Sequence, residues 1–274
     1  MESDYMDLGV KYDKNNRNHR FVRSVVITIV SLITFLILWW IGTILMNDRN
    51  FPTPDKVFKA LWELIIYGDR IGGHSVWDYI YISFRTFLQG FGLSLIIAVP
   101  LGLILGFVEP LREFTAPWIE IVRPIAPIAW APIFVLSFGS VVGPALVVFI
   151  GIFFPLLTSI IFGVQKIDQN WLDASKTLGA SQGQIFVKVV IPATVPYILN
   201  GIKIGLGVGW MCIVAAEIYN KYGGIGQYLV DMVNGGLMAN AFAAIIIIAI
   251  LGLATTGVAD YASRVISKRM GLDL

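Results

Sequence analysis

Long apolar runs divided by short polar segments dominate this chain. The first run, residues 25–46, is long enough to cross a hydrocarbon core of about 30 Å as one helix. The next segment, 47–75, is more polar, and its apolar positions recur at helical spacing: Val57, Phe58, Leu61, Trp62, Leu64 and Ile65. The pattern predicts a spanning helix followed by an amphipathic helix that lies on the extracytoplasmic membrane surface.

Five further spans are predicted within residues 76–266. Their approximate ranges are 76–108, 115–138, 141–163, 189–216 and 241–266. Prolines 117, 124, 127 and 132 interrupt the range 115–138, and each proline frees a backbone carbonyl that a neighbouring group must satisfy. That helix is expected to be kinked or broken. The predicted fold class is an all-α integral membrane protein with six transmembrane helices.

The composition agrees with a membrane protein, since 57% of the 274 residues are hydrophobic and only 14% are charged. Soluble domains carry roughly 25% charged residues. One cysteine, Cys212, and two distant histidines, His19 and His74, cannot form a disulfide or a Cys/His metal site. No metal is therefore expected, and the net charge of +2 gives no reason to expect nucleic-acid binding.

The distribution of Lys and Arg predicts the orientation. If the N-terminus is inside, twelve of these residues fall in cytoplasmic segments and five fall in extracytoplasmic ones. Cytoplasmic flanks are enriched in Lys and Arg. The N-terminal segment 1–24, the loop 165–188 and the C-terminal segment 267–274 are therefore predicted to be cytoplasmic, in a multi-pass protein of the inner (plasma) membrane.

Small residues recur every fourth position in three of the predicted spans. These positions are Gly90, Ser94, Ala98, Gly102 and Gly106, then Gly151, Pro155, Ser159 and Gly163, then Gly201, Gly205 and Gly209. Helices in lipid approach closely where small residues form such ridges. The ridges predict a tightly packed bundle.

The loop 165–188 carries the signals of a helix outside the membrane. Asp168 is a plausible N-cap, and Gly179 stands where a left-handed C-cap is expected. Trp171, Ala174 or Ser175, and Leu178 fall on one face. A capping box of Ser181 and Gln184 begins a second helix, which Pro192 is expected to interrupt. So long and ordered a connection is expected to dock into another protein, with Asp168, Trp171 and Asp173 among the docking residues.

At this loop the sequence resembles ABC-type importer permeases. The triplet Asp173-Ala174-Ser175, Gly179 and the run Val189-Val190-Ile191-Pro192 are similar to their EAA loop, with conservative departures such as Asp173 for the first Glu. The similarity extends along about 79–266. It narrows to the branch that moves nitrate, bicarbonate, aliphatic sulfonates, taurine and some pyrimidine vitamin precursors. The stretches that carry it are 123–132, 153–155, 193–207, 214–217 and 224–226.

The resemblance implies a type I importer fold and a set of partners. Two permease subunits, expected to be a homodimer, would form the pathway through the lipid bilayer. Two cytoplasmic ATPase subunits would dock on the coupling loops, and an extracytoplasmic binding protein would deliver the solute. The chain has no Gly-x-x-x-x-Gly-Lys-Ser/Thr phosphate loop. It is therefore expected to be a non-catalytic transport subunit without cofactors, with ATP and Mg on the partner ATPase.

Five residues are candidates for the translocation path. Arg123, Lys203 and Glu217 are ionisable groups in or beside spans, where such a group is costly unless it is paired or hydrated. For each, a structural partner is the alternative: freed carbonyls for Arg123, a carboxylate for Lys203, and a backbone amide or cation for Glu217. Trp130 and Trp210 are candidate gates, with packing between helices as the alternative.

The function predicted from these residues is the permease subunit of an ATP-driven importer for a small solute, expected to be anionic. An importer of an uncharged vitamin precursor is one alternative. A secondary transporter driven by an ion gradient is another, but it needs intramembrane carboxylates, and Asp78, Glu217 and Asp260 all lie near the ends of predicted spans. A membrane-bound enzyme is a third alternative, but it needs a constellation of His or Cys residues that this chain lacks.

Overall fold

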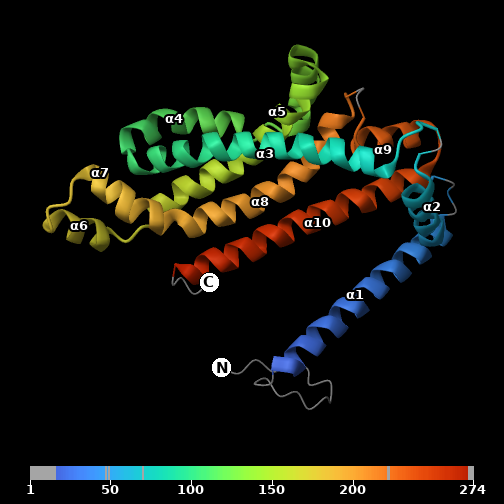
Figure 1. The fold of residues 1–274 in the computed structure, drawn as a ribbon, viewed down its shortest axis with the longest axis horizontal. Helices are drawn as coiled ribbons and strands as arrows, with labels where there is room; N and C mark the ends of the chain where they lie inside the picture. Colours follow the sequence, from blue (N-terminus) through green and yellow to red (C-terminus); the bar gives the residue numbers. More distant parts are fainter. Residues whose placement is uncertain (1–16, 47, 49, 70, 221–222, 271–274) are drawn as a thin grey trace. The chain divides into compact units, whose positions relative to one another are not determined.

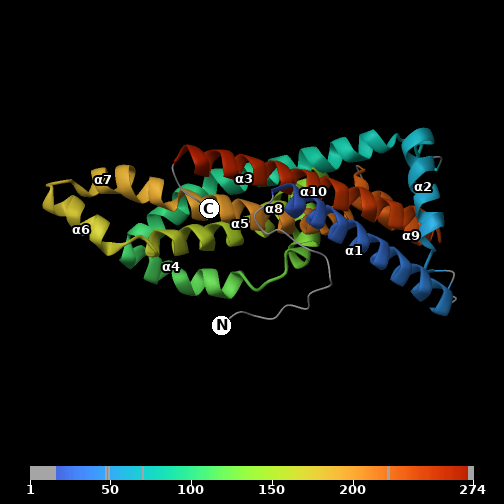
Figure 2. The same cartoon turned by 90° about the horizontal axis from the view of Figure 1, so that it is seen from below.

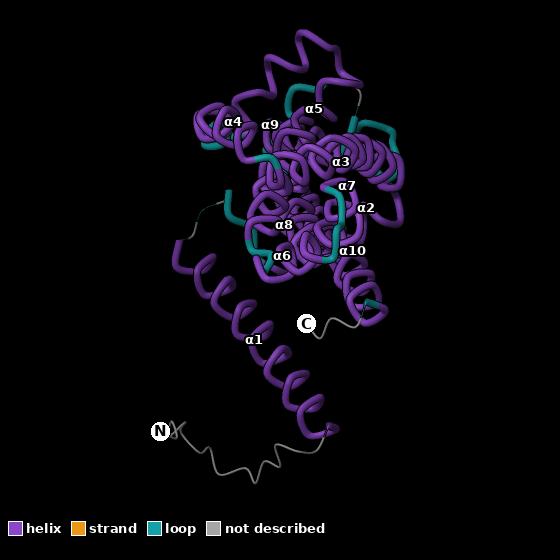
Figure 3. Tube along the Cα trace, turned by 90° about the vertical axis from the view of Figure 1, so that its left-hand side faces the viewer, coloured by secondary structure: helices purple, strands orange, loops and turns teal. Residues whose placement is uncertain are grey.

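The computed structural model describes residues 17–46, 48, 50–69, 71–220 and 223–270. Within these ranges the chain forms ten α-helices and one π-helical turn and has no strand (Figure 3). It divides into two units, residues 1–59 and 60–274. Most of the predicted N-terminal segment 1–24, and residues 271–274 of the predicted C-terminal segment, lie outside the described residues.

The first unit contains α1 (Arg17–Met46), of which residues 23–46 are long and apolar enough to span a bilayer. This helix contains the predicted first span. The amphipathic helix predicted in 47–75 is α2 (Pro54–Tyr67), which crosses from the first unit into the second. Within the second unit, Leu64 packs in an apolar cluster with Val76, Ile225 and Met232, while Trp62 is exposed.

The core of the second unit is built from four long helices. They are α3 (Val76–Phe107), α5 (Pro127–Gln165), α8 (Ile191–Glu217) and α10 (Met238–Arg269). The main packing contacts join α5 to α3 and to α8, and α10 runs along α8 (Figures 1 and 2). The short helices lie at the two ends of this bundle, with α6 (Gln169–Thr177) and α7 (Gln182–Ile185) at one end and α9 (Ile225–Asn234) at the other (Figure 1).

The ridges of small residues form the helix contacts. A Cβ at Gly90 would lie 2.5 Å from the carbonyl oxygen of Ala145, and one at Gly102 would lie 2.8 Å from Ile160 Cβ. On α8, a Cβ at Gly205 would lie 2.8 Å from the side chain of Ile152. Any side chain at these positions would separate the helices, so the predicted close packing is confirmed.

The predicted third span, 115–138, is not one helix. Its first half belongs to α4 (Glu109–Val122), which carries four charged residues and has no buried residue. Its second half begins α5 at Pro127, after a break at residues 123–126. Ala126 has extended backbone (φ −58°, ψ 132°) because proline disfavours helical backbone in the residue before it. Five described helices are long and apolar enough to cross a bilayer, so the predicted number of six is approximate.

A sharp turn at Gly139 divides α5 and separates the predicted third and fourth spans. Gly139 has φ 78° and ψ 172°. Beyond the turn, a Cβ at Gly143 would lie 2.6 Å from Val135 Cα. Eight residues of straight helix would hold these positions about 12 Å apart, so the chain folds back on itself at Gly139.

The prediction that Pro192 interrupts the helix is wrong. Residues 182–217 are helical throughout, with a π-helical turn, η1 (Phe186–Val190), before the proline. The N–H of Ile191 donates to the carbonyl of Phe186, five residues earlier. Because the Pro192 ring clashes with the carbonyl one turn before it and supplies no N–H, the wider turn accommodates the proline without ending the helix.

Candidate functional site

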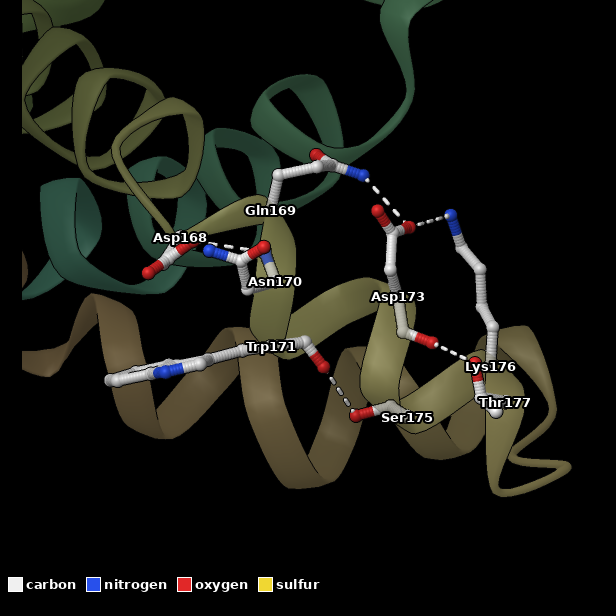
Figure 4. Close-up of polar contacts among 8 residues, drawn as sticks. All are labelled: Asp168, Gln169, Asn170, Trp171, Asp173, Ser175, Lys176 and Thr177. Atoms are coloured by element: carbon white, nitrogen blue, oxygen red, sulfur yellow. Dashed lines mark hydrogen bonds and ion pairs between the residues drawn. The ribbon is translucent and has the colours of Figure 1, made fainter.

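The predicted docking helix is α6, which stands with α7 at one end of the bundle (Figure 1). Asp168 caps its start, as predicted, because its carboxylate accepts a hydrogen bond of 2.9 Å from the N–H of Asn170 (Figure 4). This bond satisfies one of the free amides of the first turn. A short helix outside the bundle is thereby fixed at its beginning.

Gly179 ends α6 with a left-handed backbone, φ +79°. Its N–H donates to Lys176 O at 2.9 Å, and the N–H of Ala180 donates to Ser175 O at 3.0 Å. These two bonds form a Schellman motif. Ser181 then opens α7 with a capping box, in which it exchanges hydrogen bonds with Gln184. The predicted caps and the reversal between the two helices are confirmed.

Asp173 binds to its own helix. Its Oδ1 accepts from Lys176 Nζ at 3.1 Å and from Gln169 Nε2 at 3.2 Å (Figure 4). These two donors, of which Lys176 has the larger effect, hold the pKa of the Asp173 carboxyl below its ordinary value. The carboxylate therefore stays charged at neutral pH and lies on the exposed side of α6.

Leu172 of α6 packs against the bundle, but the other apolar residues of α6 and its C-cap are exposed. Trp171 has 58% of its surface accessible and Leu178 has 87%, and Ala174 is also exposed. The Ser175 hydroxyl donates to Trp171 O at 2.7 Å and is thus occupied within the helix (Figure 4). A groove of about 460 Å³ separates α6 from the start of α8 and the end of α10, and its lining residues are Trp171, Ser175, Lys188, Val189, Pro192, Ala193 and Met270.

The structure does not bring the five path candidates together. Arg123 lies at the end of α4, exposed, and its side chain makes no hydrogen bond or ion pair with any described residue. Trp130, near the start of α5, stacks on Phe134 with 5.6 Å between ring centroids. Its indole Nε1 is buried and has no partner among the described residues. The carbonyls freed by the neighbouring prolines do not bind the Arg123 guanidinium.

Lys203 and Trp210, both on α8, contact other helices. Lys203 Nζ forms an ion pair of 2.9 Å with Asp260 on α10. The Trp210 ring is only 4% exposed, stacks on Phe87 at 4.8 Å, and donates from Nε1 to Thr255 at 2.8 Å. Both side chains therefore have the structural partners that were the alternatives to a role in the path.

Glu217, at the end of α8, is fully buried in a polar network between three helices. Its Oε2 accepts from Ser83 Oγ at 2.9 Å and from the N–H of Gly226 at 2.8 Å, while Ser83 Oγ accepts from the N–H of Ile225 at 2.9 Å. The carboxylate thus lies at the N-terminus of α9, where the helix dipole favours negative charge. Gly224, with φ +118°, leaves the space, since a Cβ there would lie 2.4 Å from the Glu217 carboxyl carbon.

The sequence pattern indicates Glu217 and the run 224–226 but not Ser83. A serine in an apolar helix gives no local sign of a partner that lies 134 residues away. Only the approach of α3 to α8 and α9 reveals it.

The architecture is similar to that of the membrane subunits of ABC transporters. The membrane chain of the MetNI methionine ABC transporter is similar, with a TM-score of 0.57 and 17% identity, covering 70% of this chain and 94% of that one. At this identity the likeness concerns the fold.

Sequence comparison identifies the family. Residues 98–272 match the binding-protein-dependent transport system inner membrane components, and this chain belongs to that family. A permease protein from Methanocaldococcus jannaschii is 37% identical, over 80% of this chain and 82% of its own length. The taurine transport system permease protein of Escherichia coli strain K12 is 32% identical, over 74% and 75%. A nitrate import permease protein from Leptolyngbya laminosa is 31% identical, over 87% and 88%. The chain is an ABC importer permease of the inner membrane.

Proposed function

We propose that two copies of this chain form the pathway of an importer for a small oxyanion such as nitrate, bicarbonate, a sulfonate or taurine. Two ATPase subunits, which hold ATP and Mg, bind the α6 helices on the cytoplasmic side. A solute-binding protein delivers the anion on the opposite side. This chain itself is non-catalytic, with both termini in the cytoplasm.

The observation that carries the ATPase partnership is the exposed and doubly capped α6. The exposed Trp171 and Leu178 gain nothing for the chain alone, whereas exposed aromatic and aliphatic residues are typical anchors of a protein interface. The caps of Asp168 and Gly179 hold these side chains in place before the partner arrives. Less conformational entropy is then lost on binding.

Two observations support an anionic solute. The taurine and nitrate permeases named above carry solutes with a sulfonate or nitrate group, and both are more than 30% identical to this chain. Within this chain, Arg123 is an exposed cation without a partner among the described residues, beside the break between α4 and α5. A free cation near a narrow path raises the local concentration of anions.

The test is uptake by the whole importer. The chain would be purified with its co-purifying ATPase and binding protein and reconstituted into liposomes, and uptake of labelled nitrate, bicarbonate, taurine and an uncharged pyrimidine would be measured. ATP-dependent uptake of one anion, unaffected by ionophores, is expected. Uptake of the pyrimidine alone would contradict the anionic solute. Uptake that follows an ion gradient without ATP would contradict the whole assignment.

A further inference from the structure

The exposed side of α3 carries a polar stripe in its first half. The buried side of this helix, with Ser83 and Phe87, faces the bundle. The opposite side carries the stripe, whose members are exposed and recur at helical spacing: Asp78, Tyr81, Arg85 and Gln89. Trp77, Phe84 and Leu88 are exposed beside the stripe. Polar and charged side chains next to them would not be expected if this side faced lipid alone.

Arg85 is a cation without a counter-charge in the described chain. Its side chain forms no hydrogen bond or ion pair with any described residue. The neighbours one turn away are Tyr81, Ile82, Leu88 and Gln89, none of which is acidic. Asp78 lies two turns away, and its carboxylate is held by the N–H of Ser75 in the capping box that begins α3.

Two charged groups inside other described spans have partners, unlike Arg85. Lys203 pairs with Asp260, and Arg264 lies one turn beyond the same carboxylate. Glu217 accepts two hydrogen bonds in its buried network. Arg85 therefore differs from Lys203 and Glu217 in having no partner within the described chain.

Depth along the helix argues against a lipid environment for the stripe. With 32 residues, α3 is about 48 Å long, against a hydrocarbon core of about 30 Å. Arg85 lies about 14 Å from the start of the helix and Gln89 about 20 Å. An arginine can extend toward the headgroups, but the short Gln89 side chain, which has no partner in the described chain, cannot reach them. Lipid would leave its amide unsatisfied at several kcal/mol.

We propose that this side of α3 lines the hydrated solute path and that Arg85, with Gln89 one turn deeper, binds the oxyanion group of the solute. The inference rests on the proposed import of an anion. A guanidinium presents paired N–H donors to a nitrate, sulfonate or carboxylate group, and an amide N–H adds a further donor. Gly92 continues the stripe with open space where a Cβ would lie, and Ile96, 73% exposed, ends it. The site is thus confined to the first half of α3.

The test uses small thiol reagents of opposite charge, so that the solute need not be known. In the assembled importer, Gln89→Cys and Leu88→Cys would each be made with Cys212→Ala. Anionic sulfonatoethyl methanethiosulfonate and cationic trimethylammonioethyl methanethiosulfonate would be added from water. We expect Gln89→Cys to react, and Leu88→Cys, 49% exposed and about 100° around the helix from Gln89, to react far more slowly. Arg85→Gln should lower the anionic-to-cationic rate ratio at Gln89→Cys about tenfold.

Two matched variants isolate the charge of Arg85. Arg85→Lys should keep the rate ratio near that of the parent, and Arg264→Gln, which removes a cation elsewhere, should leave it unchanged. Equal, slow reaction at both cysteine positions would show that the stripe faces lipid and would overturn the proposal. A rate ratio that stays unchanged in Arg85→Gln would also overturn the proposal. If Gln89→Cys forms oxidative cross-links between two copies but does not react with the reagents, the stripe is a contact between subunits and does not line the path. If the ratio responds as expected but no anion is imported, the proposed solute fails and the assignment of the path stands.

Discussion

The Glu217 carboxylate and the Ser83 hydroxyl meet at 2.9 Å although 134 residues separate them in the sequence. Through this contact α3, α8 and the N-terminus of α9 share one buried network. The Gly226 N–H, the Ser83 hydroxyl and the positive end of α9 compensate for the lost water at Oε2, while Oε1 has no partner among the described residues.

Removal of the carboxylate should destabilise the protein. Glu217→Ala leaves the Gly226 N–H and the Ser83 hydroxyl without their acceptor, at about 1–3 kcal/mol for each unsatisfied group. Thermal unfolding in detergent should therefore shift to lower temperature, and less so for Glu217→Gln, which keeps one acceptor oxygen. Ser137→Ala, at an exposed position on α5, is the control. An unchanged melting temperature for Glu217→Ala would show that the network contributes nothing.

The turn after α6 should be sensitive to a side chain at Gly179. Gly179→Val forces a β-branched residue to φ +79°, at roughly 1–2 kcal/mol. No neighbour would obstruct the new Cβ, so the effect comes from the backbone alone. Binding of the ATPase, measured by co-purification and by uptake, should weaken. Gly183→Val is the matched control, because that glycine also has open space but no positive φ. Equal binding by both variants would count against α6 as the docking helix.

The Asp173 pair predicts a pH dependence of α6. Because its pKa is lowered in the folded chain, the pair contributes its stabilisation at neutral pH and loses it only as the pH falls through that lowered pKa. Docking should therefore be insensitive to pH near neutrality. Lys176→Met should raise the Asp173 pKa toward its ordinary value, and Gln169→Ala should raise it less. An NMR titration of isotope-labelled aspartate carboxyl groups in the full chain measures both shifts. No shift in Lys176→Met would show that the pair does not form.

The predicted orientation can be tested with cysteines at the two ends of the second unit. Ile71 and Gly183 are exposed, and a side chain at Gly183 meets no neighbour. In a Cys212→Ala background, Ile71→Cys should react with an impermeant reagent from outside, and Gly183→Cys only after the membrane is opened. Gly72 is less suitable, because a Cβ there would lie 2.5 Å from Asp69 Oδ2. Labelling of both positions from one side would contradict the orientation.

Arg123 should affect transport more than assembly. Its guanidinium has no partner in the described chain, so Arg123→Gln removes charge without breaking an internal contact. Uptake of the anion should fall several-fold while co-purification of the ATPase and basal ATP hydrolysis remain near the parent values. Loss of assembly would make Arg123 a structural residue of the complex. Arg123→Lys, which keeps the charge, should restore much of the uptake.

Local features were predictable because they depend on residues close in the sequence. Asp168 and Gly179 mark the ends of α6 through bonds that span at most five residues. The position at which a proline-rich helix breaks was less predictable, because it depends on the backbone preferences of several adjacent residues at once. The prolines of 115–138 indicated a break, but α4 and α5 continue through Pro117 and Pro132 and are broken near Pro124 and at Gly139. Pro192 was expected to interrupt a helix that a π-helical turn keeps intact.

The sequence by itself determined the class of the protein, its long helices and the capped helix α6. Apolar run length and helical caps are local quantities, and the family resemblance is carried by residues along the chain. Only the tertiary structure decided which polar groups are compensated. It pairs Lys203 with Asp260 and Glu217 with Ser83, packs Trp210 against Phe87, and leaves Arg85 without a partner in the described chain. These outcomes depend on which helices lie side by side, because a buried charge finds its partner across a helix contact and not along the chain.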